Sequence, residues 1–228
     1  RSSMRGKLPT RASSSAPRST ARCARAARSW PQDPTLPAER LAVIVRDCGI
    51  GVVLADDAAV RTLEAAAADL DATVVGPSDS LTLPTVTRAE LDAAPVEFTP
   101  AGGPATDLDL AYIMYTSGST GVPKGMMHTH RGSLAYARWG AGHVALTRED
   151  RVASHAPLHF DLSIFDFFST AQAGGCVVLV PEPVTKFPAS CTECLAAERV
   201  TVIFTAPFTL IEFLERGARD KRDLAALR

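Results

Sequence analysis

Residues 115–125 read Tyr-Thr-Ser-Gly-Ser-Thr-Gly-Val-Pro-Lys-Gly, directly after an apolar run at 110–114 that predicts a buried strand. The stretch contains three glycines, several hydroxyl side chains and a lysine. Glycines let backbone N–H groups approach an anion closely, hydroxyls donate hydrogen bonds to phosphate oxygens, and lysine supplies a mobile positive charge. The pattern therefore predicts a loop that binds a polyphosphate.

Two other interpretations of this loop fit the residues poorly. A P-loop NTPase needs a glycine five residues after its first glycine, followed by lysine and then Ser or Thr. Counted from Gly118 that position is Pro123, and Lys124 is followed by Gly125. A flexible Ser/Gly linker is not usually preceded by an apolar strand, nor followed by Pro-Lys-Gly and the helix that we expect here.

The stretch resembles the phosphate-binding signature of the adenylate-forming superfamily, which includes acyl-CoA synthetases, nonribosomal-peptide adenylation domains and luciferase-like ligases. The signature Tyr-Thr-Ser-Gly-Ser-Thr-Gly-x-Pro-Lys-Gly is long and nearly fixed in spelling, so the match is specific. The resemblance implies ATP as co-substrate, with Mg²⁺ sharing the phosphate charge, and it makes Lys124 the catalytic candidate. The residues that would bind the β- and γ-phosphates are Thr116, Ser117, Gly118, Ser119, Thr120, Gly121 and Lys124.

The composition is that of a soluble globular protein, with 46% apolar and 21% charged residues among 228. No apolar run approaches the roughly 20 residues that a membrane helix needs. Five cysteines occur without a secretory signal, which is typical of reduced thiols in a cytosol. We therefore expect a cytoplasmic protein without a membrane partner.

Charge is distributed unevenly along the chain. Residues 1–30 contain eight Arg or Lys and no acid, which leaves 24 − 8 = 16 basic and 25 acidic residues, a net charge of −9. That acidic body does not indicate nucleic-acid binding. The basic head fits a mitochondrial transit peptide, a disordered tail or, as our preferred hypothesis, an out-of-frame translation of a GC-rich gene. We expect residues 1–30 to be a disordered or out-of-frame head, and residues 31–228 to be a partial adenylation (AMP-binding) N-terminal domain that is truncated at its C-terminal side.

Helix and strand patterns alternate after Pro37. Residues 76–107 are rich in proline and polar residues, which predicts a surface connection with one short helix near 88–93. Repeated βα units predict an α/β fold with layered, largely parallel sheets covered by helices, which the resemblance makes part of the N-terminal domain of an adenylate-forming enzyme. Strands are expected at 50–54, 72–75, 110–115, 152–155, 176–180 and 201–205, and helices at 37–49, 57–70, 129–141, 162–172, 189–199 and 208–216.

A second motif lies at 157–168, which reads Pro-Leu-His-Phe-Asp-Leu-Ser-Ile-Phe-Asp-Phe-Phe. The residues alone favour a helix start, with Asp161 as N-cap or first-turn acid and the phenylalanines as a core stripe. The resemblance reverses this preference, because Phe-Asp-x-Ser begins the substrate-pocket helix of amino-acid-activating members, and Asp161 takes the position that pairs with the substrate ammonium. A cation in an apolar pocket needs such a counter-charge.

Further pocket residues follow from the resemblance. Leu162, Phe165 and Phe204 would line a compact apolar pocket without a second charge, which fits a small hydrophobic substrate and is similar to the pattern of stand-alone ligases that load proline onto a carrier protein. Adenylation needs no general base, because the attacking carboxylate is already ionised and catalysis is mainly positioning and charge neutralisation. A histidine often follows the signature in this family, and His130 fits that position better than His128.

The sequence as a whole predicts a fragment of an ATP-dependent ligase that converts an amino acid, small and hydrophobic such as proline, to aminoacyl-AMP for transfer to the phosphopantetheine thiol of a carrier protein. The family's later Tyr-Gly-x-Thr-Glu and Thr-Gly-Asp motifs are absent, as is its small C-terminal domain, so we expect the 228-residue chain to be inactive alone. The alternatives are an acyl- or aryl-CoA ligase fragment and an inactive remnant that at most binds nucleotide. A general NTPase or kinase ranks last.

Overall fold

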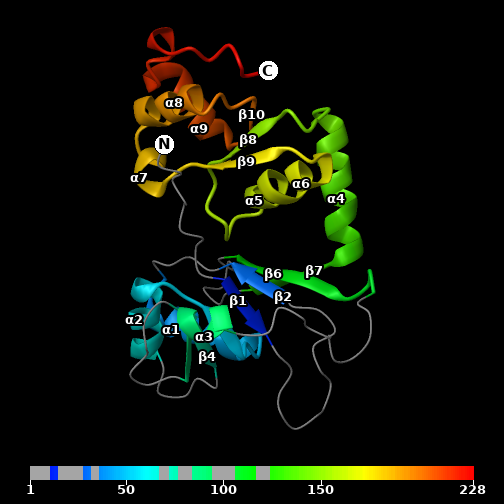
Figure 1. The fold of residues 1–228 in the computed structure, drawn as a ribbon, viewed down its shortest axis with the longest axis vertical. Coiled ribbons are helices and arrows are strands. Elements are labelled where there is room, and N and C mark those ends of the chain that lie inside the picture. Colours follow the sequence, from blue (N-terminus) through cyan, green and yellow to red (C-terminus); the bar gives the residue numbers. More distant parts are fainter. Residues whose placement is uncertain are drawn as a thin grey trace. The chain divides into compact units, whose positions relative to one another are not determined.

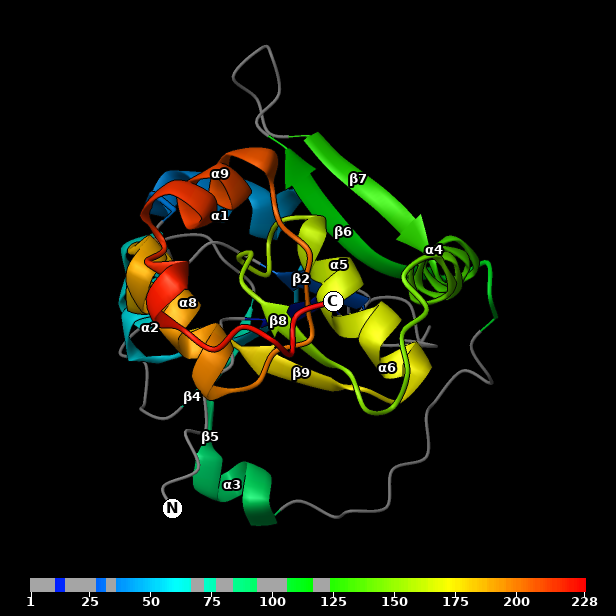
Figure 2. The ribbon, with the colours of Figure 1, turned by 90° about the horizontal axis from the view of Figure 1, so that it is seen from above.

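The computed structural model describes residues 11–14, 28–31, 36–66, 72–76, 84–93, 106–116 and 124–228. The chain divides into two compact units, one of residues 8–131 and one that contains residues 132–228. Each unit has its own sheet and its own apolar core (Figures 1 and 2). Within the part of the chain that the structure describes, every helix is too short or too polar to span a bilayer.

The unit of residues 8–131 is built on a mixed sheet with the strand order β5-β4-β3-β1-β2-β6-β7 among the described residues. Strands β3, β4 and β5 are parallel, whereas β6 and β7 form an antiparallel hairpin. The strands are β1 Arg11–Ser14, β2 Arg28–Pro31, β3 Val52–Leu54, β4 Thr73–Gly76, β5 Thr85–Thr87, β6 Leu110–Thr116 and β7 Lys124–Thr129, and the helices are α1 Ala38–Asp47, α2 Asp57–Ala66 and α3 Arg88–Ala93.

Helix α1 shows how the sequence pattern builds this core. Its apolar residues Leu41, Ile44 and Val45 recur at helical spacing and are buried, with Ile44 only 1% exposed. Burying each of these side chains contributes about 1.5–3 kcal/mol. The helix ends before Gly49, whose φ of +57° is easy only for glycine.

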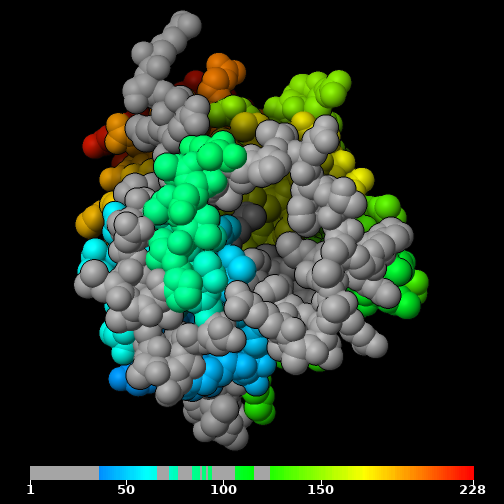
Figure 3. All heavy atoms as spheres, turned by 60° about the horizontal axis from the view of Figure 1, so that its bottom comes forward, coloured from blue at the N-terminus to red at the C-terminus, as the bar shows by residue number. Residues whose placement is uncertain are grey.

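Helix α3 begins with a capping box. The backbone N–H of Thr87 donates to the Glu90 carboxylate at 2.7 Å, and the backbone N–H of Glu90 donates back to the Thr87 hydroxyl at 3.3 Å. This reciprocal pair accounts for the predicted short helix at 88–93. Figure 3 shows α3, in green, on the surface of its unit.

The unit of residues 132–228 contains a parallel three-stranded sheet with the order β10-β8-β9. Successive residues of β8 face opposite sides of it. Val152 packs with Phe165 and Val202, whereas Ala153 packs with Cys191, Leu195 and Phe213 from the helices on the other face (Figure 1). The strands are β8 Arg151–Ser154, β9 Cys176–Leu179 and β10 Val202–Ile203, and the helices are α4 His130–His143, which begins at the boundary between the units, α5 Leu162–Ile164, the π-helix η2 Phe165–Ser169, α6 Thr170–Ala173, α7 Glu182–Thr185, α8 Pro188–Ala197, α9 Pro207–Arg216 and the short 3-10 helix η3 Arg219–Lys221.

Several elements differ from the sequence prediction. Residues 124–129 were expected to lead into a helix, yet they form strand β7, because each of them pairs with β6 across the hairpin. Strand β5 and helix α7, each of three or four residues, were not predicted. The prediction of a disordered or out-of-frame head at 1–30 stays a prediction; the described parts of that region are β1 and most of β2.

Candidate functional site

The hairpin of β6 and β7 holds the two ends of the predicted phosphate loop together. Thr116, the last residue of β6, pairs with Lys124, the first residue of β7, and Lys124 is exposed. The loop candidates Ser117, Gly118, Ser119, Thr120 and Gly121 lie outside the described residues. The structure therefore defines the stem of the loop, and the assignment of these residues to phosphate stays a prediction.

Tyr115 anchors this stem to the end of α1. Its phenol donates a hydrogen bond to the carboxylate of Asp47, and its oxygen lies 3.1 Å from the sulfur of Cys48. Burial, together with the Asp47 carboxylate, raises the pKa of Tyr115 above its ordinary value, so the phenol stays a donor. Sequence reasoning did not find this contact, because the partners are separated by 68 positions along the chain.

Gly125 closes the stem opposite Tyr115, with which it pairs across the hairpin. A Cβ atom at Gly125 would lie 3.0 Å from the ring Cζ of Tyr115 and 3.0 Å from Cγ2 of Ile113. Such distances are tighter than most real Cβ contacts, so the neighbours would have to shift slightly. The last glycine of the signature thus serves the packing of the stem.

The two histidines after the signature have different surroundings. His128 stacks on Tyr112 across the hairpin, with ring centroids 4.7 Å apart and planes inclined by 18°. His130 begins α4, its backbone N–H donates to the carbonyl of Asp109 at 3.0 Å, and its buried Nε2 has no hydrogen-bond partner among the described residues. His128 is therefore in a packing contact, whereas His130 carries a buried ring nitrogen without a partner among the described residues.

The second motif forms the start of a helix in the other unit. The Ser163 hydroxyl donates to the carbonyls of Leu158 and Phe160, at 3.0 and 2.7 Å, and so shapes the turn that precedes α5. Asp161 occupies the N-cap position, but its side chain makes no capping hydrogen bond and is exposed. The sequence predicts the N-cap position of Asp161 correctly. Its side chain, however, does not cap the helix as side chains at this position usually do.

Two predicted pocket residues are in contact. The rings of Phe165 and Phe204 lie 4.9 Å apart, with planes inclined by 51°. Phe165 is 5% exposed, while Phe204, directly after β10, is 37% exposed. Leu162 is half-buried three residues before Phe165 on the same helical run, a spacing that places side chains on one face. The structure thus brings Phe165 and Phe204 together, with Leu162 and Asp161 just before them at the start of the same helical run.

Asp166 is a buried acid that sequence reasoning missed. Its side chain is 0% exposed, and burial raises its pKa to about 8, an effect only partly offset by the Ser154 hydroxyl. The signal in the sequence is an acid within the run Phe-Asp-Phe-Phe at 165–168, where a charged side chain would interrupt the core stripe.

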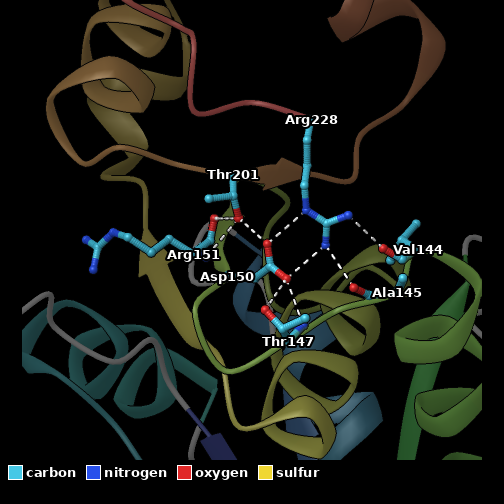
Figure 4. Close-up of polar contacts among 7 residues, drawn as sticks. All are labelled: Val144, Ala145, Thr147, Asp150, Arg151, Thr201 and Arg228. Atoms are coloured by element: carbon cyan, nitrogen blue, oxygen red, sulfur yellow. Dashed lines mark hydrogen bonds and ion pairs between the residues drawn. The ribbon is translucent and has the colours of Figure 1, made fainter.

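A network around Asp150 joins four segments of the same unit (Figure 4). The buried carboxylate accepts hydrogen bonds from the Thr147 backbone N–H at 2.7 Å, the Thr201 hydroxyl at 2.7 Å and Arg228 Nη2 at 2.8 Å. Arg228 also donates to the two carbonyls that follow α4, at 3.1 and 3.0 Å. The Arg228 guanidinium, with help from Thr201 and Thr147, holds the pKa of Asp150 well below its usual range. This network is structural, because every bond links one part of the unit to another.

The comparisons with known proteins agree with this picture. The sequence profile of the family described as AMP-binding enzyme matches residues 23–228, and the chain belongs to this family, part of the adenylate-forming superfamily. It is similar to an L-proline--[L-prolyl-carrier protein] ligase of Pseudomonas fluorescens, 39% identical over 109 residues, or 48% of this chain and 22% of that protein. It is 34% identical over 181 residues to the phenyloxazoline synthase MbtB of Mycobacterium tuberculosis, covering 78% of this chain and 13% of that protein.

The fold is also that of the family. The structure superposes on the anthranilate CoA ligase AuaEII with a TM-score of 0.72 at 21% identity, over 86% of this chain and 38% of that chain. This likeness confirms the α/β fold with helix-covered sheets that the sequence predicts. The chain spans less than a quarter of the length of each of these two curated relatives.

Proposed function

We propose that the chain is part of an ATP-dependent ligase that activates an amino acid as aminoacyl-AMP and passes it to the phosphopantetheine thiol of a carrier protein. The substrate carboxylate would attack the α-phosphate of ATP and release pyrophosphate. The loop from Thr116 to Lys124 would bind the β- and γ-phosphates, and Lys124 would supply positive charge beside them. Support comes from the signature on its hairpin stem and from relatives that are carrier-protein ligases and peptide synthetases.

Mg²⁺ would arrive with the nucleotide, because this ion binds largely through phosphate oxygens and water. No group of three His, Cys, Asp or Glu side chains among the described residues could hold a metal by itself. The hydroxyls of the loop suit such a shared site, since oxygen ligands are those that Mg²⁺ prefers. The ion would neutralise charge on the phosphates, while this chain's own residues orient them.

The observation that carries the amino-acid assignment is Asp161. Its carboxylate is exposed, it caps no helix N–H, and it stands at the start of the helical run that presents Leu162 and Phe165. An ammonium group bound beside these apolar side chains needs an opposite charge, whereas a fatty or aryl acid needs none. The contact between Phe165 and Phe204 gives the wall an apolar part, which fits a small apolar substrate such as proline.

Exchange of ATP with labelled pyrophosphate tests the proposal, in a polypeptide that carries these residues within a complete adenylation domain. We expect exchange with an amino acid, and a loss of at least about 100-fold in kcat/KM for Asp161→Ala, because a desolvated ion pair lost with one partner left behind costs about 3 kcal/mol or more. Asp220→Ala, an exposed acid on η3, is the matched control and should leave exchange unchanged. Exchange with fatty or aryl acids that ignores Asp161→Ala would contradict the proposal, and so would a complete domain that binds no ATP.

A further inference from the structure

Asp166 is a buried acid that the proposed reaction does not use. No hydrogen bond of ordinary geometry reaches its carboxyl oxygens from the described residues, although the Ser154 hydroxyl is near enough to lower its pKa in part. Two further hydroxyls on the same helical run, those of Ser169 and Thr170, are likewise buried without a partner. Carboxylates are almost never fully buried unless they are paired, and an unpaired one becomes neutral instead of staying ionised. The burial that raises the pKa of Asp166 to about 8 therefore keeps this side chain largely protonated at neutral pH.

Among the described residues, the elements packed against η2 place no unpaired charge beside Asp166. These elements are α5, α6, β8, the end of β10 with Phe204 and, through Gly140, α4. Neither α5 nor α6 carries a titratable side chain, and Arg151 of β8 is bonded to Glu198. The titratable side chains on the part of α4 within this unit are the half-buried Tyr136 and the exposed Arg138 and His143.

Two neighbours of β8 complete this environment. Ser154 stands two residues after Val152 and so on the face of β8 that η2 covers, and its hydroxyl is the polar neighbour that affects Asp166. His155 follows it, and burial lowers its pKa, so the ring stays neutral, edge-on to Phe213 at 5.5 Å. Among the residues that the structure describes, ionised Asp166 would therefore face hydroxyls, a neutral imidazole and apolar side chains.

The position of Asp166 connects this environment to the proposed substrate pocket. It directly follows Phe165, and both residues are buried, at 0% and 5% exposed. Phe165 contacts Phe204 on one side, and on another it lies close to Gly140, where a Cβ atom would come within 3.0 Å of its ring. The run is wound as a π-helix, a form found most often as single turns at functional sites. Any loosening of this turn moves Phe165.

We infer that Asp166 is a positioning residue: as a neutral acid it lets the π-helical turn pack between β8 and α4, and so holds Phe165 against Phe204 in the wall of the pocket. This inference rests on the proposed function for the meaning of the pocket. Ionisation of Asp166 at alkaline pH places an unpaired charge in the core, loosens the turn and weakens amino-acid binding. The turn is thus a pH-sensitive part of the site.

The first test uses the 228-residue chain and its urea unfolding between pH 5 and 9.5. A carboxyl whose pKa is raised on folding keeps a proton that the unfolded chain has lost, so stability falls as pH rises from about 4 to about 8 and then levels off. Asp166→Asn has the same shape and cannot ionise. The wild-type unfolding constant should therefore rise relative to that of Asp166→Asn, by about tenfold per pH unit across this window. Asp161→Asn, which removes an exposed carboxylate from the same helix start, is the control and should follow the wild type.

Equal pH slopes for the wild type and Asp166→Asn would overturn the inference. If Asp166→Asn does not fold, carbon-13 NMR of labelled aspartate in the wild type decides. One carboxyl resonance should titrate near pH 8, well above the ordinary value of about 4. A chain in which every aspartate carboxyl titrates below about pH 5 would also overturn it.

The second test uses the complete ligase and separates positioning from mere stability. The KM for the amino acid should rise between pH 7 and 9 in the wild type more than in Asp166→Asn, while the KM for ATP changes equally in both. Parallel amino-acid profiles would overturn the positioning role. A complete domain without amino-acid activation would refute the proposed function instead, and the unfolding and NMR results would still report on Asp166 itself.

Discussion

Tyr115 and Gly125, at the two ends of the signature, contribute to contacts within the protein. The phenol of Tyr115 bonds to Asp47 at the end of α1, and its ring fills the space that a side chain at Gly125 would need. The residues between them were assigned to phosphate because of their backbone and hydroxyl groups. The signature on which the resemblance rests therefore combines a part assigned to ligand binding with a stem that is determined by packing.

The first prediction concerns Gly125→Ala. A Cβ atom 3.0 Å from both Tyr115 and Ile113 requires these neighbours to shift by a few tenths of an ångström, and overpacking of this kind typically costs about 1–3 kcal/mol. We expect the midpoint of urea unfolding to fall. Met127→Ala on the same strand is the control, because Met127 is 74% exposed and its exchange should change stability by less than about 0.5 kcal/mol. Equal stability of the two variants would show that the stem accommodates a side chain at 125.

At the scale of elements, the contacts between neighbouring segments decide where side chains point. Helix α4 and the π-helix η2 approach closely at Gly140, where a Cβ atom would lie 2.6 Å from the Ser169 hydroxyl. The same position on α4 also lies close to the ring of Phe165. The small residue on α4 thus leaves the space that the aromatic residue of η2 needs in order to contact its partner.

The second prediction is that Gly140→Ala destabilises the chain by about 1–3 kcal/mol, despite the better helix propensity of alanine. Gly142→Ala on the same helix is the control. Its Cβ atom would meet nothing within 4 Å, so the propensity should stabilise that variant or leave it unchanged. Ser169→Ala removes the hydroxyl in the way and should recover part of the loss in the double variant, as a double-mutant cycle would measure. A destabilisation that Ser169→Ala does not relieve would argue against this contact.

The third prediction concerns the network of Asp150. Asp150→Asn removes the charge that Arg228 pairs with, and we expect a loss of about 1.5–3 kcal/mol at pH 7, the range of a hydrogen bond to a charged group. Because folding lowers the pKa of Asp150, its contribution is complete above the unfolded value of about 3.9 and is lost as pH falls below it. The difference between wild type and variant should therefore shrink below pH 4 in urea unfolding. A difference that stays constant down to pH 2 would contradict the linkage.

At the scale of the whole molecule, the chain carries two separate cores, each around its own sheet. The core of residues 8–131 is centred on Val74, Leu63 and the α1 residues, whereas that of residues 132–228 is centred on β8 with helices on both faces. The phosphate signature belongs to the first unit and Asp161 to the second. A ligase of the proposed kind must use both.

The fourth prediction is that the 228-residue chain gives no ATP–pyrophosphate exchange above background. The match covers 22% of the length of the prolyl-carrier ligase that the chain resembles, so it accounts for only part of that ligase. The complete adenylation domain of the pyrophosphate exchange assay under the proposed function serves as the positive control. Clear turnover by the chain itself would refute the prediction, and it would assign the whole reaction to the residues present.

Particular elements show how far sequence reasoning reached. Helices α1, α8 and α9 lie within one or two residues of their predicted bounds, because apolar spacing, proline at the start and, for α1, glycine at the end are local signals. Strand β7 was missed because its residues are mostly exposed and do not alternate, so that only pairing with β6 makes it a strand. The π-helical winding at 165–169 was missed for a similar reason, since it depends on what packs around it.

The sequence by itself determined the family, the signature at 115–125, the position of Asp161 at a helix start and the alternation of strands and helices. These features are local, and they follow from residue type and spacing over a few turns of chain. Only the tertiary structure decided that Tyr115 bonds to Asp47, that Phe165 meets Phe204 and that Asp166 is buried without a charged partner. Each of these depends on segments far apart in the sequence, and burial among them, unlike spacing, sets the dielectric environment in which a carboxyl group keeps or loses its proton.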